Sequence, residues 1–284
     1  MSLYYASLNR SALGKRSPSS APLNRSPFIR PTRPIPAAFD PAKLERITRK
    51  LDGADEEWFA ARSKKRVDNR TPASFLHELY NPGEKVVVFD VFASQGQHLW
   101  THREPPFDAD ELDSFRTGKP HGVWFLCNPV SGEYLENRKN DDGSPHYSRR
   151  FDGVVTSWKY LVLESDKANP AHWLAALAQL PLPIAAIYTS GGETSIHALV
   201  RMNAASKAQW DSLADKLKPM LIPLGADPGA ISAVRLTRLP LCERLGKEDK
   251  LGNYIRFPEP RLQRLYYLNG NPDLTPICDQ EEIR

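Results

Sequence analysis

A chain of 284 residues, 40% hydrophobic and 25% charged, has the composition of a globular protein that buries a sizeable core. Its three cysteines, Cys127, Cys242 and Cys278, are too few and too widely spaced for a disulfide framework or a paired-cysteine zinc site. No apolar run reaches the roughly 20 residues that cross a bilayer, and the N-terminus lacks the apolar segment of a secretory signal. We therefore expect a cytoplasmic protein with no membrane partner.

The net charge of +4 is unevenly distributed, because residues 1–39 carry +6 with no acid and the remaining chain carries −2. Residues 1–39 are rich in Ser, Pro and Arg, a composition that cannot bury enough surface to order itself. We predict a disordered basic tail that acts as a solvated linker. A weak electrostatic contact with DNA is the alternative function for this tail.

Residues 40–158 are predicted to form a helical and α/β N-terminal module. The first helix begins at Asp40, an N-cap acid followed by Pro41, and continues with apolar residues at helical spacing. Two further helices are expected over 54–65 and 71–80. A strand over 85–93, a short helix over 108–118, a strand over 122–130 and a polar loop over 131–153 then follow along the chain.

Residues 159–284 show a more regular order of predicted elements. Strands are expected over 160–165, 184–189, 195–202 and 231–239, with helices over 169–180 and 206–221 and a glycine turn over 190–194. This β-α-β-β-α-β order is that of the ferredoxin-like arrangement and of RNA-recognition modules. It places the first and third strands side by side at the centre of one sheet, with both helices on one face and the other face open.

Two carboxylates end the first of these strands. Glu164 and Asp166 are two residues apart, so they point to the same side of the strand. Two like charges roughly 5 Å apart at an effective dielectric of 20 repel by about 3 kcal/mol. A bound cation would remove that repulsion, and hard oxygen ligands suit Mg²⁺ or Mn²⁺. Taken alone, such an acidic pair is more often a solvated turn.

The third predicted strand brings a histidine to the same open face. Alternation places Ser195 and His197 on that face, whereas Ile196 and Ala198 should pack on the helices. A lone histidine at such a position is more often structural than catalytic. The combination of this histidine with carboxylates on the neighbouring strand is what favours a metal-dependent site.

Further candidates precede and occupy the last predicted strand. Asp227 could supply a third carboxylate. Arg235 and Arg238 could clamp phosphates, because guanidinium groups are planar, permanently charged and bidentate. The simpler interpretation of both arginines is surface ion pairing, which contributes little to stability.

The segments "LVLESD", "TSGGETSIHALVRM" and "DPGAISAVRLTRLP", in that order, resemble the archaeo-eukaryotic primase superfamily. The most similar branch is that of the plasmid- and phage-borne RepB-like primases and primase-polymerases. "WFLCNPVSGEY" and "LQRLYYLNGNPDLTPI" extend the likeness over residues 85–277. The resemblance implies an α+β fold in which a small α/β N-terminal module packs on an RNA-recognition-like catalytic module, with the site between them.

The resemblance also assigns roles to individual residues. Glu164 and Asp166 match the metal-binding acids of the first motif. Ser195 and His197 match the second motif, whose histidine contacts the phosphates of the incoming nucleotide. Asp227 is our match for the third acid. Arg235 and Arg238 match the basic residues near the triphosphate.

The chain departs from the pattern of this branch at three positions. Glu193 lies in the glycine turn where many members have a basic residue, and Leu241 stands where a glycine often follows the proline. Ser232 occupies the place where other members have the third acid. If Asp227 does not replace that acid, only two carboxylates would remain to bind metal.

The predicted function is that of a template-dependent nucleotidyltransferase, a DNA primase or primase-polymerase that uses nucleoside triphosphates on single-stranded DNA. Two Mg²⁺ or Mn²⁺ ions would assist the transfer. The sequence contains no Gly-Lys-Ser/Thr phosphate-binding loop, so if the protein primes replication we expect a separate replicative helicase, or one on a longer polypeptide of which this chain is a part.

Two alternative functions remain open. The first is a catalytically impaired replication initiator or nucleic-acid-binding protein of the same fold. The second is metal-dependent hydrolysis of a phosphodiester, because a similar set of acids can activate water.

Other residues that could carry chemistry have simpler interpretations. Trp100, Trp124 and Trp158 could stack on bases, but we assign them to the core. His121, Cys127 and His146 are too irregularly spaced to predict a metal site.

Overall fold

The computed structural model describes residues 38–282 except for residues 52, 91–96, 102–113, 192–194 and 250, and these described residues belong to one compact unit, Pro36–Arg284. Almost all of the predicted basic tail, the greater part of the helix expected over 108–118, and Glu193 lie outside the described residues. These expectations, and the division into modules at residue 158, stay predictions.

Three short helices form inside the ranges predicted for them: α1 (Pro41–Thr48), α2 (Glu56–Ala61) and α3 (Pro72–Leu79). Asp40 caps α1 by accepting a hydrogen bond from the Lys43 amide at 3.0 Å. Thr71 and Ser74 form a reciprocal capping box at the start of α3. These local hydrogen bonds explain why the starts of the helices could be read from the sequence.

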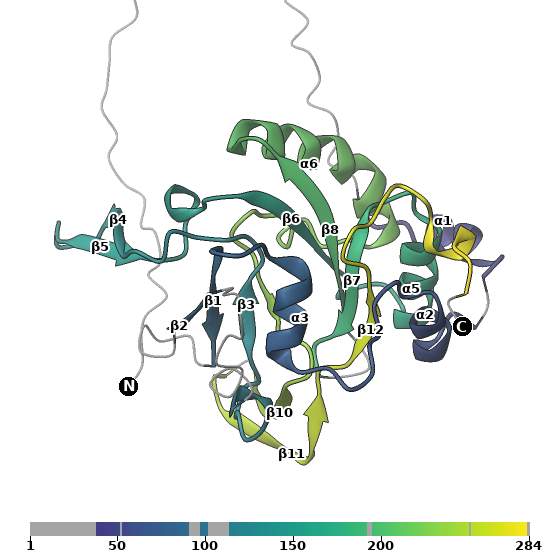
Figure 1. Ribbon diagram of the computed structural model, residues 1–284, viewed down its shortest axis with the longest axis horizontal. Helices are drawn as coiled ribbons and strands as arrows, with labels where there is room; N and C mark the ends of the chain where they lie inside the picture. Colours follow the sequence, from purple (N-terminus) through teal and green to yellow (C-terminus); the bar gives the residue numbers. More distant parts are fainter. Residues whose placement is uncertain are drawn as a thin grey trace, which may run out of the picture. The chain divides into compact units, whose positions relative to one another are not determined.

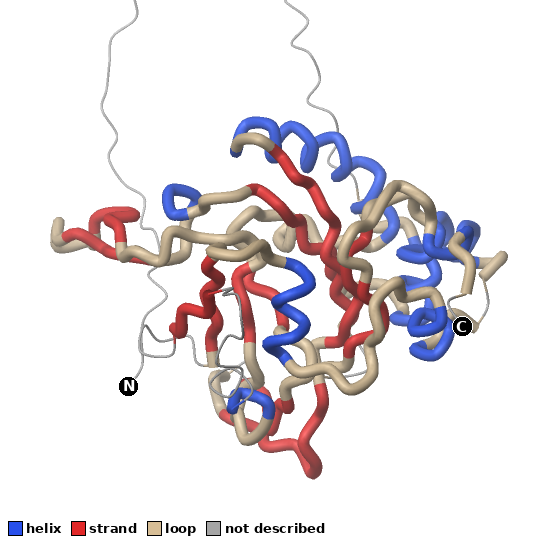
Figure 2. Tube along the Cα trace, in the orientation of Figure 1, coloured by secondary structure: helices blue, strands red, loops and turns tan. Residues whose placement is uncertain are grey.

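The first sheet has the strand order β2-β1-β3-β9, and all its pairings are antiparallel (Figure 1). Its strands are β1 (Lys85–Phe89), β2 (Gln97–Thr101), β3 (Trp124–Leu126) and β9 (Leu236–Arg238). Two pairs of strands form separate ribbons (Figure 2): β4 (Leu135–Lys139) with β5 (Pro145–Ser148), and β10 (Glu243–Glu248) with β11 (Tyr254–Leu262). The expectation of a strandless polar loop over 131–153 is therefore wrong. Cross-strand pairing stabilises β4 and β5 although both strands lack a continuous apolar face.

The second sheet has the order β12-β7-β8-β6. Its strands are β6 (Trp158–Glu164), β7 (Ile184–Thr189), β8 (Ile196–Ala204) and β12 (Leu265–Leu268). Helix α5 (Pro170–Gln179) connects β6 to β7, and helix α6 (Lys207–Leu221) follows β8. Short 3₁₀ helices complete the described elements: Ser114–Arg116, Asp152–Val154, Ile222–Leu224 and Ile277–Asp279. The chain is thus a mixed α+β protein with antiparallel sheets.

Two details of the predicted ferredoxin-like sheet are wrong. The segment 231–239 does not supply its last strand, because only Leu236–Arg238 is a strand and it pairs with β3 in the first sheet. The last strand of the second sheet is β12. Although β6 and β8 are neighbours as expected, β6 lies at the edge and not at the centre. Strand-forming residues predict that a segment will pair, but not with which partner.

Helices α1, α2, α5 and α6 share one hydrophobic core with one face of the second sheet. Ile196, Ala198 and Val200 of β8 point into this core, as alternation predicts. Leu199 points to the other face, where a second core joins α3 to both sheets (Figure 1). The open face of the predicted sheet is therefore covered by α3 and the first sheet, and His197 lies at this junction.

The tryptophans confirm most of the core assignment. Trp100 and Trp124 are buried, and Trp158 is partly buried against the core that contains the helices.

Among the helices of the described residues, none combines the length and apolar character that crossing a membrane requires.

The three cysteines make a labelling prediction. All three are free thiols, and Cys127 and Cys242 are buried whereas Cys278 is partly exposed. Burial raises the pKa of the Cys127 thiol to about 12, and the thiolate is the reactive form. At pH 8 we expect an alkylating reagent to modify Cys278 alone in the native protein and all three cysteines after denaturation. Peptide mass mapping measures this difference, and rapid native labelling of Cys127 would contradict the fold.

Candidate functional site

His197 occupies the face of β8 that is turned toward the first sheet. It lies directly opposite Glu164 in the β6–β8 pairing, and its ring stacks on Tyr188 of β7 with 5.7 Å between ring centroids and 10° between planes. The residue is buried, but beneath the first sheet and not beneath the helices. The alternation argument for this face is confirmed.

The imidazole of His197 is held at both nitrogen atoms. Its Nδ1 lies 3.1 Å from the Thr237 hydroxyl and 3.2 Å from Glu164 Oε2, and its Nε2 lies 3.3 Å from the Ser195 hydroxyl. Burial, with the positive charges of Arg238 and Arg235, lowers the pKa of His197 to about 3. The ring is therefore neutral near pH 7, and the carboxylate beside Nδ1 favours the tautomer that carries its proton there.

Glu164 is a buried carboxylate at the end of β6. Its Oε2 faces His197, and its Oε1 accepts a hydrogen bond from Arg235 Nη2. Burial raises the pKa of Glu164, Arg235 opposes that rise, and the negative charges of Asp166 and Asp227 add to it. Glu164 is thus within electrostatic range of both other candidate acids.

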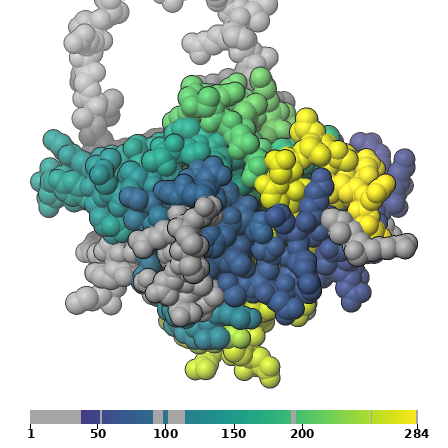
Figure 3. Space-filling view, viewed as in Figure 1, coloured from purple at the N-terminus to yellow at the C-terminus, as the bar shows by residue number. Residues whose placement is uncertain are grey.

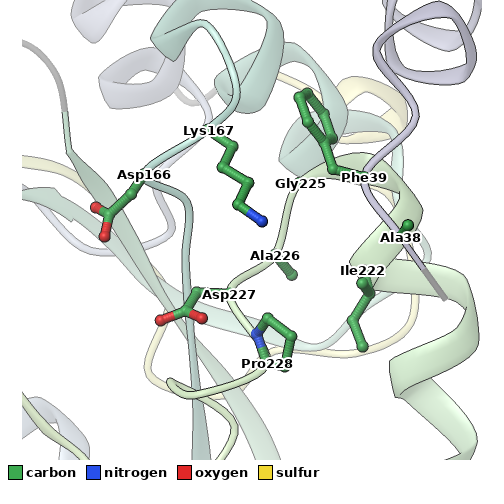
Figure 4. A pocket seen from close by; sticks show the side chains of 9 residues that line it. All are labelled: Ala38, Phe39, Asp166, Lys167, Ile222, Gly225, Ala226, Asp227 and Pro228. Atoms are coloured by element: carbon green, nitrogen blue, oxygen red, sulfur yellow. The ribbon is translucent and has the colours of Figure 1, made fainter. Parts of the chain in front are cut away.

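Asp166 and Asp227 line one pocket of about 370 Å³ beside this network. The Asp227 amide donates a 2.9 Å hydrogen bond to the Glu164 carbonyl, which attaches the segment after α6 to the end of β6. Figure 4 shows the two carboxylates extending toward the same side of the pocket, with Phe39 and Ile222 on the opposite side. Because Asp166 is exposed and Asp227 is partly exposed, both can reach a ligand without unfolding the core.

The two predicted phosphate-binding arginines have different surroundings. Arg235 is partly exposed, with a side-chain exposure of 30%, and contacts Glu164. Arg238 is buried, with its guanidinium 3.8 Å above the Trp124 ring and its Nη1 2.6 Å from the His121 carbonyl. Burial and the nearby charge of Arg244 lower the pKa of Arg238 to about 8, and Glu164 acts in the opposite direction. The surface ion-pair interpretation therefore does not describe Arg238.

The structure brings Glu164, Ser195, His197 and Arg235 into one polar network, with Asp166 and Asp227 in the adjacent pocket. Sequence reasoning missed Thr237 and Tyr188, whose hydroxyls are 2.7 Å apart and which contact His197. No local signal identifies them, because threonine and tyrosine are ordinary strand residues. In the described part of the chain, no three His, Cys, Asp or Glu side chains are grouped closely enough to hold a metal ion.

The Thr237 hydroxyl makes a stability prediction. The Thr237→Val variant has a methyl group in place of the hydroxyl. The buried His197 Nδ1 and Tyr188 hydroxyl each lose their hydrogen bond to residue 237. We expect the free energy of unfolding to fall by about 1–3 kcal/mol in denaturant titration. The Thr237→Ser variant keeps the hydroxyl and serves as the control. Equal losses in the two variants would show that packing of the methyl group, and not the hydrogen bonds, stabilises this position.

Comparison with known proteins assigns no family to the chain: no protein-family model, no curated protein and no solved structure matches it.

Proposed function

We propose that this protein is a template-dependent nucleotidyltransferase of the archaeo-eukaryotic primase type, which makes or extends primers on single-stranded DNA from nucleoside triphosphates. One observation carries the proposal. Glu164 contacts the buried His197 imidazole and the Arg235 guanidinium, and the Asp227 amide bonds the Glu164 carbonyl, which brings the pocket of Asp166 and Asp227 next to them. An acidic group for divalent ions next to a basic group for phosphates is what nucleotidyl transfer requires.

Carboxylate oxygens, the ligands that Mg²⁺ and Mn²⁺ prefer, line one side of the pocket. They belong to Asp166 and Asp227, and Glu164 would complete a set of three acids only if its side chain left both Arg235 and His197. Divalent ions bound there would supply charge neutralisation for the attacking hydroxyl, the triphosphate and the leaving pyrophosphate.

The chain's own residues would bind and orient the nucleotide. Ser195, which lies beside His197 Nε2, and the guanidinium groups of Arg235 and Arg238 would hold the phosphates. His197 is itself fixed at Nδ1 by Glu164 and Thr237, and it would donate to a bound triphosphate only after its Nε2 takes up a proton, which the phosphate charges and Glu164 would favour.

The test is an extension assay with primed and unprimed oligonucleotide templates, Mn²⁺, and labelled ribo- or deoxynucleotides. Wild-type protein is expected to lengthen the strand, whereas Asp227→Asn should not. Asp227 is partly exposed, so this variant is expected to keep its fold. Shortened oligonucleotides would instead identify phosphodiester hydrolysis. Wild-type product equal to that of Asp227→Asn would remove the assignment of Asp227.

The second candidate function is a replication initiator that keeps DNA binding without synthesis. One contact favours it: Arg235 already neutralises Glu164, so this carboxylate is satisfied without a metal ion. Ser232, in place of the expected third acid, agrees with this alternative. It predicts DNA binding that needs no metal and does not change in a Glu164→Gln variant.

A further inference from the structure

Three arginines outside the carboxylate pocket converge beside the glycine turn that leads to Ser195. They are Arg238 of β9, Arg244 of β10 and Arg261 of β11, and Arg244 is directly paired with Arg261 across the β10–β11 ribbon. A Cβ atom added at Gly122 would lie 3.2 Å from both Arg238 Nη1 and Arg244 Cβ. The three residues are called the arginine cluster below.

The arginine cluster is attached closely to the candidate site. At Gly191, where the turn after β7 begins, an added Cβ would lie 3.3 Å from Arg244 Cβ and 3.3 Å from the Arg261 carbonyl. Gly191 and Gly122 both have a positive φ, of 80° and 78°, so these close approaches occur where the backbone itself favours glycine. Arg244 and Arg261 thus lie against Gly191, four residues before Ser195, and the cluster continues onto the ribbon.

No carboxylate among the residues that the structure describes forms an ion pair with any of the three guanidinium groups, although Glu243, Glu248 and Glu259 are on the same ribbon. Burial is the main cause that lowers the pKa of Arg238 and of Arg244. The second cause is the positive charge of a neighbouring arginine, which is Arg244 for Arg238 and Arg261 for Arg244. Like charges that form no ion pair destabilise one another, and an anionic ligand would reduce that cost, which the charge of Glu164 offsets in part at Arg238.

Aromatic rings orient these guanidinium groups. The Arg238 guanidinium lies 3.8 Å above Trp124, and those of Arg261 and Arg244 lie 4.0 and 5.6 Å from the Phe257 ring. Arg238 Nη1 donates to the His121 carbonyl and Arg244 Nε donates to the Gly246 carbonyl, at 2.6 and 2.7 Å. Stacking on a ring face leaves the other N–H donors at the edge of each guanidinium group for a ligand.

The ribbon continues this pattern away from the site. Lys247 and Arg256 add positive charge alongside the acids Glu248 and Glu259. The aromatic Tyr254 and the aliphatic Ile255 expose 43% and 45% of their surface. Figure 3 shows the ribbon protruding at the lower edge of the molecule. Basic side chains interleaved with aromatic ones along an extended surface are typical of proteins that bind single-stranded nucleic acid.

We propose that the arginine cluster binds phosphate groups of a single-stranded nucleic-acid backbone that runs along the β10–β11 ribbon into the candidate site. The choice of nucleic acid as the phosphate source rests on the proposed function. A bound nucleoside triphosphate would offer the same chemistry at Arg238, but it is too short to occupy the ribbon.

The test is a fluorescence-anisotropy titration of a labelled 20-nucleotide oligo(dT) without nucleotide or metal, comparing wild-type protein with an Arg244→Gln/Arg261→Gln variant. Neither residue belongs to the candidate catalytic group. We expect Kd to rise about tenfold or more at low salt. The slope of log affinity against log salt should become shallower by about 1.4, or about 0.7 for each lost phosphate contact.

The matched control is the Arg49→Gln/Arg66→Gln variant. It removes the same charge from two exposed arginines that pair with Glu45 and Asp68. We expect it to bind oligo(dT) like the wild-type protein, and thermal unfolding should show that both variants are folded. Equal losses in the two variants would overturn the proposal, because affinity would then follow net charge alone.

A second titration, with a fluorescent nucleoside triphosphate and Mn²⁺, separates the two phosphate sources. The proposal expects no change in nucleotide affinity for Arg244→Gln/Arg261→Gln. Loss of nucleotide binding with intact oligo(dT) binding would overturn it. Because this assay measures binding and not synthesis, arginine-dependent DNA binding in a protein that makes no product would support the arginine cluster while removing the proposed enzyme function.

Discussion

An Asp166→Asn variant is expected to lose at least about 100-fold in kcat/KM for nucleotide incorporation, because the amide keeps the shape of the side chain but removes an anionic oxygen ligand. Asp166 is exposed at the mouth of the pocket that it shares with Asp227, so the substitution should leave the melting temperature unchanged. The measurement is primer extension at several Mn²⁺ concentrations.

The control for Asp166→Asn is Asp215→Asn. Asp215 is an exposed acid on α6 that pairs with Lys218 at 2.8 Å and does not line the pocket. It undergoes the same chemical change and should retain wild-type activity. If Asp166→Asn also retained it, the pocket carboxylates would have no part in catalysis.

Glu164→Gln distinguishes the two proposed functions. Glu164 would contribute to a metal site only in the nucleotidyltransferase, so synthesis should fall in that case while DNA binding persists. In the initiator, neither DNA binding nor any other activity should depend on the Glu164 charge. Binding and extension measured on the same preparation therefore separate the two functions.

The second large effect is expected for stability, at Asn128. This amide is fully buried between β3 and the free edge of β6. Its Oδ1 accepts hydrogen bonds from the Lys159 and Tyr160 amides, each at 2.8 Å, and its Nδ2 donates to the Tyr160 and Ala233 carbonyls at 3.0 and 2.9 Å. The side chain thus replaces a missing neighbouring strand along part of β6.

Asn128→Ala should lower the free energy of unfolding by about 3 kcal/mol or more, because a buried backbone group left without a partner costs about 1–3 kcal/mol. Activity should fall as well, since Ala233 belongs to the segment that carries Arg235. Chemical denaturation measures the loss. The control is Asn140→Ala, which removes an exposed amide bonded to Ser144 and should change stability by less than about 0.5 kcal/mol. Similar losses in both variants would contradict this role of Asn128.

Local signals in the sequence determined the elements that need no distant partner to be recognised. Asp40, Thr71 and Ser206, the first residues of three predicted helical ranges, each cap a helix, because an N-cap bonds only to amides two or three residues ahead. Period-two alternation put Ile196 against the helices and His197 on the opposite face, because the direction of a strand side chain depends on parity alone.

The choice of strand partners was decided by the tertiary structure. The segment around Leu236–Arg238 has a strand pattern that fits either sheet, and it pairs with β3. Asn128 satisfies the edge of β6 that a strand could otherwise have occupied. The β3–β9 pairing joins residues more than 100 positions apart in the sequence, and no short window of sequence contains that information.

For the candidate site, the sequence by itself determined which side chains are present and on which strands they lie: two acids at the end of one strand, and a histidine on the neighbouring strand. The tertiary structure decided their partners. Because β9 joins the first sheet, Thr237 reaches His197, Arg235 reaches Glu164, and Arg238 begins a basic cluster with Arg244 and Arg261. The sequence specifies the type of each side chain, but the neighbours of that side chain depend on how distant strands pack together.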